Sequence, residues 1–133
     1  MAFMNENIVI TQANNESEGW KRILGFLQQE NIHQKNTLAD MLKRNDGRNE
    51  YLLEIAEHYQ SQFLQQDEAF RLMWNDLSML DRLIKEEMPG NDPHTREACY
   101  RQMMLRKEIK DLELNFDKLK RDFSGFSKTF AEA

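Results

Sequence analysis

Apolar residues recur at alternating steps of four and three positions through most of residues 49–130, and this rhythm is typical of long paired helices. The first set is Leu52, Ala56, Tyr59, Phe63, Gln66, Phe70, Met73, Leu77, Leu80 and Ile84, in which Gln66 is the one polar interruption. The second set is Leu105, Ile109, Leu112, Phe116, Leu119, Phe123, Phe126 and Phe130, and the same spacing extends backwards to the polar Gln102 and to Ala98. We call the two sets together the seam. A seam of this length predicts two long helices that pack along their apolar sides.

The segment between the two sets, Met88-Pro89-Gly90-Asn91-Asp92-Pro93, can end one helix and begin the next. Reflecting the chain about Asn91 brings the two sets level with one another, for example Phe63 with Leu119. A heptad pattern has seven phases, so a match of this kind would arise by chance roughly one time in seven. The reflection therefore supports a chain that doubles back at its prolines.

A length of 133 residues suits a single domain, expected over residues 16–133. We expect an all-α fold, an antiparallel three-helix bundle with helices at about 16–45, 49–88 and 93–130. The last two would form a long coiled-coil-like hairpin. Residues 1–15 show no helical period and include the β-favouring run Ile8-Val9-Ile10, so we expect an extended N-terminal arm that is either docked or frayed.

Charge also favours pairing of the second and third helices. Residues 49–88 carry nine Asp and Glu against three Lys and Arg, whereas the third helix has more basic than acidic residues. The expected pairs beside the seam are Asp67 with Lys120, Asp81 with Arg106, and Asp76 with Arg101. Each exposed pair contributes roughly 0 to 1 kcal/mol, so the pairs would set orientation more than stability.

The first helix is expected to be about ten residues shorter than the other two. It should therefore leave the end of the hairpin near Pro89 uncovered. That end carries a second apolar set, Leu72, Met79, Leu83, Tyr100, Met103 and Met104. We call this set the stripe and predict that it binds the N-terminal arm, a second copy or a different protein. The alternative is that the stripe belongs to the bundle core.

Overall charge and cysteine content exclude several classes of protein. The net charge of −5 argues against a dedicated nucleic-acid binder, which needs a basic surface to neutralise phosphates. Cys99 is the only cysteine and cannot form an internal disulfide; we interpret it as a small buried hydrophobe. No secretion signal is recognisable, and no apolar run approaches the roughly 20 residues that span a bilayer. We expect a soluble, cytoplasmic protein.

A polar interval in the first helix, residues 28–37, is the only region that suggests a ligand. Counting back from the turn near Gly47 brings Asn31 level with Phe63 and Gln28 level with Gln66, so Gln66 either fixes the helix register or lies at the bundle edge. Glu30 and His33 have the Glu-x-x-His spacing of metal-binding bundles. A di-metal site needs a second such motif, which the sequence lacks.

We predict a non-enzymatic protein-protein interaction module: a small adaptor, assembly factor or chaperone-like protein that forms a homodimer through the stripe. No phosphate-binding glycine loop, G-x-S-x-G or Cys-x-x-Cys motif occurs, and no cofactor is expected. One alternative is a bundle that binds a metal or small ligand near Glu30 and His33. A second is a lipid-surface protein that exposes the four phenylalanines of residues 116–130, although burying each contributes roughly 1.5 to 3 kcal/mol.

Overall fold

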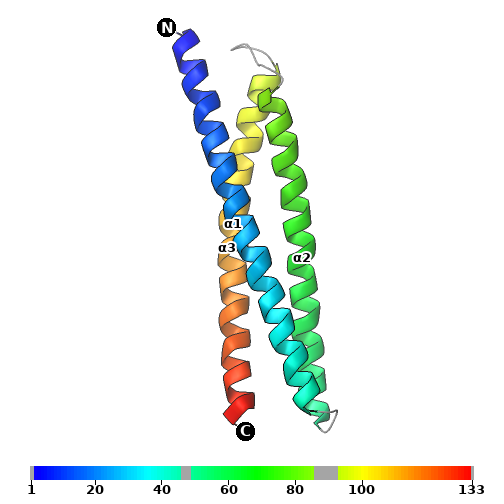
Figure 1. The fold of residues 1–133 in the computed structure, drawn as a ribbon. Helices are drawn as coiled ribbons and strands as arrows, with labels where there is room; N and C mark the ends of the chain where they lie inside the picture. Colours follow the sequence, from blue (N-terminus) through cyan, green and yellow to red (C-terminus); the bar gives the residue numbers. More distant parts are fainter. Residues whose placement is uncertain (1, 46–48, 86–92, 133) are drawn as a thin grey trace. The chain divides into compact units, whose positions relative to one another are not determined.

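The computed structural model describes residues 2–45, 49–85 and 93–132, and in these residues it contains three α-helices and no β-strand. The helices are α1 (Ala2–Asn45), α2 (Glu50–Lys85) and α3 (Pro93–Glu132), labelled in Figure 1. The prediction of an all-helical bundle is confirmed. The turn expected between Met88 and Asp92 lies outside the described residues.

The ends of the helices follow local capping chemistry. Asn49 caps α2, since its side-chain oxygen accepts a hydrogen bond of 3.2 Å from the backbone nitrogen of Leu52. Lys43 and Arg44 occupy the last turn of α1, where basic residues interact favourably with the helix dipole. Pro93 is the first residue of α3, a position that needs no backbone N–H.

The extended N-terminal arm predicted for residues 1–15 is wrong, because α1 already begins at Ala2. Residues 2–15 contain neither Gly nor Pro, so nothing there stops a helix. Adding a turn to an existing helix costs far less than starting one, and this outweighs the weak β preference of Ile8-Val9-Ile10. The predicted docking of the arm concerns side chains outside the described part of the chain. With 44 residues, α1 is the longest helix rather than the shortest.

The described residues form two compact units, each with segments of all three helices. Unit 1 comprises Met1–Gly25 and Arg71–Asp111, and unit 2 comprises Phe26–Phe70 and Leu112–Ala133. Among the described helices, none combines the length and apolarity needed to cross a bilayer.

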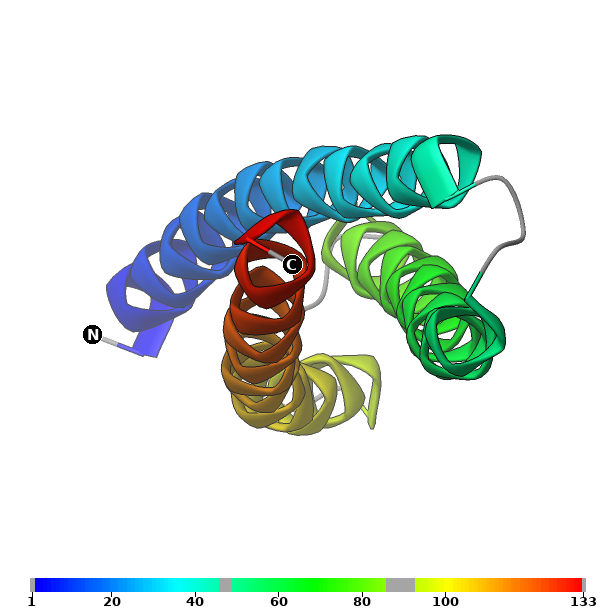
Figure 2. The ribbon, with the colours of Figure 1, turned by 90° about the horizontal axis from the view of Figure 1, so that it is seen from below.

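Unit 2 has a core to which all three helices contribute. Its buried members are Leu38, Met41, Ala56, Phe63, Leu119 and Phe123. Phe63 and Phe123 are almost fully buried, and their rings meet edge to face with centroids 5.1 Å apart. Such a pair contributes roughly 0.5 to 1.5 kcal/mol beyond the burial of its area. Figure 2 views this unit from the end where α3 finishes.

Unit 1 also buries residues from every helix. Trp20 and Leu24 of α1 are buried in it, as are Leu77, Leu80, Ile84, Ala98, Leu105 and Ile109. In both units together, every member of the seam is buried or half-buried. The prediction that the seam faces inward is confirmed.

The ion pairs predicted between α2 and α3 are wrong, because α1 supplies most of the partners instead. Asp81 pairs with Lys21 at 2.6 Å, and Arg106 with Glu16 at 2.7 Å. Asp67 pairs with Lys35 at 2.6 Å, and Lys120 with Glu30 at 2.8 Å. Arg101 pairs with Glu97, one turn earlier in α3, at 3.1 Å. The expectation of an end of the hairpin that lacks a third helix is also wrong, since Glu16 and Lys21 of α1 belong to unit 1 and pair there with α3 and α2.

Candidate interaction surface

The structure places five of the six stripe residues at the surface. Tyr100 and Met103 have 61% and 62% of their surface exposed, and Leu72, Met79 and Met104 are also exposed. Leu83 is half-buried. The alternative that the stripe belongs to the bundle core is therefore wrong for these five residues.

The position of the stripe on α2 explains its exposure. Met79 precedes the seam residue Leu80 by one position, whereas Asp81 follows it by one. These two neighbours lie on opposite sides of the seam. Asp81 accepts a hydrogen bond from Ser17 of α1 at 2.6 Å, so α1 occupies that side. Met79 and the rest of the α2 stripe remain on the side that α1 does not cover.

Glu16 fixes α1 on its side of unit 1. Its Oε1 accepts hydrogen bonds from Gln102 Nε2 at 2.6 Å and Arg106 Nη2 at 2.7 Å, and its Oε2 accepts one from Arg106 Nε at 2.9 Å. The bidentate contact with Arg106 lowers the pKa of the Glu16 carboxyl below its ordinary value of 4.5. Hydrogen bonding to Asp81 likewise raises the pKa of Lys21. These contacts hold α1 against α2 and α3 on the side of the seam that carries Asp81 and Arg106.

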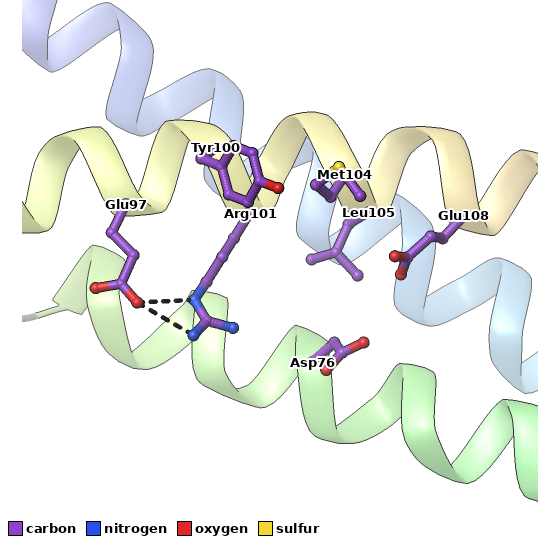
Figure 3. Close-up of a pocket in the computed structure, with 7 residues that line it drawn as sticks. All are labelled: Asp76, Glu97, Tyr100, Arg101, Met104, Leu105 and Glu108. Atoms are coloured by element: carbon purple, nitrogen blue, oxygen red, sulfur yellow. Dashed lines mark hydrogen bonds and ion pairs between the residues drawn. The ribbon is translucent and has the colours of Figure 1, made fainter.

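A groove of about 310 Å³ lies between α2 and α3 beside the stripe. It is lined by Asp76, Glu97, Tyr100, Arg101, Met104, Leu105 and Glu108, and we call this set the groove. Figure 3 shows Asp76 on α2 and the other six residues on α3. Tyr100 and Met104 belong to both the stripe and the groove. The exposed apolar residues therefore border a hollow rather than a flat surface.

Arg101 reaches across the groove toward α2. Its Nε and Nη2 donate hydrogen bonds to Glu97 Oε1 at 3.2 and 3.1 Å (Figure 3). Its Nη1 lies 3.9 Å from Met79 Sδ of α2. The groove thus holds three carboxylates and one guanidinium, and Glu97 balances the guanidinium. Asp76 and Glu108 give the groove an excess of negative charge.

Sequence reasoning missed Glu97 and Glu108 as groove residues. A signal was present, because Glu97, Arg101, Met104 and Glu108 follow one another by four, three and four residues, which places them along one side of α3. Cys99 is exposed, so its interpretation as a buried hydrophobe is wrong. It follows the buried Ala98 by one position and so points away from the seam.

Unit 2 contains the polar layer suggested by residues 28–37. The prediction that Asn31 lies level with Phe63 is confirmed, since Asn31 Nδ2 donates to the Phe63 carbonyl oxygen at 3.0 Å. The same nitrogen donates to Asp67 Oδ1 at 2.7 Å, and Lys35 donates to Asp67 Oδ2 at 2.6 Å. Asn31 Oδ1 and Gln66 Oε1 are buried acceptors without a hydrogen-bond partner.

The proposed metal-binding pair is not assembled into a site. Glu30 forms an ion pair with Lys120 at 2.8 Å, and His33 is exposed. Within the described residues, no three or more His, Cys, Asp or Glu side chains are grouped so that they could hold a metal ion.

Comparisons with protein-family models, with curated proteins and with solved structures found no match for this chain. The stripe, the groove and the charges around them are therefore the features from which we infer a function.

Proposed function

We propose that this protein is a non-enzymatic interaction module that forms homodimers through the stripe. The observation that carries this proposal is the exposure of Leu72, Met79, Tyr100, Met103 and Met104 in one compact unit. Apolar residues scattered singly over a surface need no explanation, but a patch of them marks an interaction site. Tyr100 lies one helical turn before both Met103 and Met104, so these three exposed residues form such a patch on α3. Burial of this patch by a second copy would remove it from water.

The residue types of the stripe support a protein partner. Met, Tyr and Arg are enriched at the centres of protein interfaces, and the stripe combines three methionines with Tyr100 beside Arg101. The unbranched methionine side chain adapts to irregular partner surfaces. Tyr100 supplies a large contact area with few rotatable bonds.

We also propose that α2 and α3 form an antiparallel coiled-coil-like hairpin. The ring contacts support this arrangement, because successive residues of α2 meet successively earlier residues of α3. Tyr59 stacks on Phe126 at 5.3 Å, and Phe70 meets Phe116 at 5.9 Å between ring centroids. The hairpin would bring Met79 of α2 beside Arg101 of α3, whose Nη1 lies 3.9 Å from Met79 Sδ.

The proposed role is that of a small cytoplasmic adaptor, assembly factor or chaperone-like protein. The net charge of −5 and the single cysteine are compatible with a reducing compartment and with a protein rather than a nucleic-acid partner.

The experiment replaces Met79 and Met103 together by Gln, which keeps the side-chain length and charge but removes the apolar surface. We expect the homodimer dissociation constant to rise by roughly tenfold or more, measured by sedimentation equilibrium. The matched control replaces Leu64 and Leu114 by Gln, since both are exposed in unit 2 and outside the stripe. An equal effect of the two double variants, or no effect of the first, would contradict the proposal.

A further inference from the structure

We propose that two copies dock reciprocally, with the outer face of α3 from each copy seated in the groove of the other. The outer face consists of Arg96, Met103, Lys107 and Lys110. This inference rests on the self-association proposed above and specifies which two surfaces meet.

The outer face is a continuous exposed row on α3. Its members follow one another by seven, four and three residues, the spacing of side chains along one side of a helix. All four side chains are exposed in unit 1. The row therefore presents three basic groups around one methionine.

The groove has complementary properties. Asp76 and Glu108 provide its excess of negative charge, and Tyr100, Met104 and Leu105 provide apolar lining. Lysine side chains can lay their carbon stems along apolar surface while the ammonium group reaches a carboxylate. Lys107 and Lys110 are thus suited to bring both charge and apolar contact to this groove. Met103 between the basic residues would meet the apolar lining.

A second copy fits this surface because α3 carries both halves of the contact. Met103 belongs to the outer face and the adjacent Met104 to the groove, so an α3 helix that enters a groove also offers its own groove. A two-fold axis would then repeat every contact once, as in the isologous interfaces of most homodimers. A groove facing another groove would instead bring like charges together, which disfavours that arrangement.

The corresponding hollow between α2 and α3 in unit 2 offers an internal comparison. It is lined by Gln62, Gln65, Gln66, Asn115, Lys118, Leu119 and Asp122. Leu119 is its only apolar member, and it contains no methionine or aromatic side chain. This composition favours hydration over docking and restricts the proposed contact to unit 1.

Charge reversal tests the pairing directly. The first variant carries Lys107→Glu and Lys110→Glu, which makes the outer face acidic like the groove. The second carries Asp76→Lys and Glu108→Lys, which makes the groove basic like the outer face. Each variant alone should have a homodimer dissociation constant raised by roughly tenfold or more, because both copies then repel at both contacts.

Mixing the two variants should restore association. In a heterodimer each acidic surface meets a basic one, so an equimolar mixture with one variant isotope-labelled should give 1:1 heterodimers in native mass spectrometry. A single chain with all four substitutions should likewise recover the homodimer. This fourfold variant serves as the check if either double variant folds poorly, which circular dichroism would reveal.

Matched controls change the charge by the same amount elsewhere. Lys118→Glu with Lys128→Glu controls for the first variant, and Glu54→Lys with Glu57→Lys for the second, since all four residues are exposed in unit 2. Both controls should retain the wild-type dissociation constant.

The possible outcomes distinguish reciprocal docking from the self-association on which it rests. A monomeric wild-type protein would overturn both self-association and reciprocal docking. A dimeric wild type whose two charge-reversed variants also remain dimers would leave self-association standing and overturn reciprocal docking. Monomeric variants that do not form heterodimers, together with a fourfold variant that stays monomeric, would overturn reciprocal docking as well.

Discussion

Asn31 of α1 donates a hydrogen bond of 3.0 Å from its side-chain nitrogen to the backbone carbonyl oxygen of Phe63 in α2. Asn31 is fully buried, and the same nitrogen contacts Asp67 at 2.7 Å. A shift of either helix by one turn would separate these groups and leave several buried polar atoms unpaired. This contact therefore sets the register between α1 and α2 in unit 2.

Replacing Asn31 by Asp should destabilise the protein strongly at neutral pH. The new carboxylate would be buried beside the carboxylate of Asp67, and the donor to the Phe63 carbonyl would be lost. We expect the free energy of unfolding to fall by roughly 3 kcal/mol, measured by urea denaturation. Asn31→Leu is the control, since it also removes the hydrogen bonds but adds no charge. It should lower the free energy of unfolding by less than Asn31→Asp does. A larger decrease for the Leu variant than for the Asp variant would contradict this account.

Gln66 should be a site where a substitution stabilises the protein. Its buried Oε1 has no hydrogen-bond partner, so the folded state carries the cost of removing that oxygen from water. Gln66→Leu should raise the free energy of unfolding by roughly 1 kcal/mol. Gln65→Leu, at the exposed neighbouring position, should change it by less than about half of that amount. A lower free energy of unfolding for Gln66→Leu than for the wild type would contradict this prediction and would show that the Gln66 amide stabilises the folded state.

Phe63 should be among the most sensitive positions in the core of unit 2. It is fully buried and lies against the rings of Tyr59 and Phe123. Phe63→Ala should lower the free energy of unfolding by roughly 3 to 5 kcal/mol through lost burial and a residual cavity. Tyr51→Ala provides a comparison, because Tyr51 is 70% exposed and its removal should have little effect. Similar losses for the two variants would contradict the assignment of the core.

The pH dependence of stability should include a contribution from Glu16. Its folded pKa lies below the ordinary value of 4.5, mainly because Arg106 hydrogen-bonds to the carboxylate. The resulting stabilisation is fully present above pH 4.5 and is lost as the pH falls through the folded pKa. Glu16→Gln should therefore be less stable than the wild type at pH 7, and the difference in stability between the two proteins should become smaller in acid. Thermal denaturation of both proteins between neutral and acidic pH measures this difference. A difference that stays constant well below pH 4.5 would contradict the proposed contribution of Glu16.

The heptad rhythm alone predicted most of the core. Phe63 and Phe123 could be assigned to the interior because burial in paired helices follows a fixed period that is visible in the sequence. The helical state of residues 2–15 could not, since local β preference is weaker than the tendency of a helix to continue. The length of a helix is therefore harder to predict from the sequence than the direction in which its side chains point.

The candidate site was predictable in part. The exposed methionines were recognised because the seam does not use them, but the partners of Asp81 and Arg106 were not. Those partners lie on α1, whose lateral position depends on packing rather than on any pattern within α2 or α3. The groove likewise could not be predicted from the sequence. Asp76 and Glu108 are far apart in the sequence and line the same groove only when α2 and α3 pack together.

The mass of the unmodified chain as a function of concentration tests the central claim most directly. Sedimentation equilibrium should show the average mass rising from 15.9 kDa at low concentration toward twice that value. The measurement should extend to concentrations on the order of 100 μM, where an interface with a micromolar dissociation constant would be occupied. A mass of 15.9 kDa at every concentration would contradict self-association through the stripe.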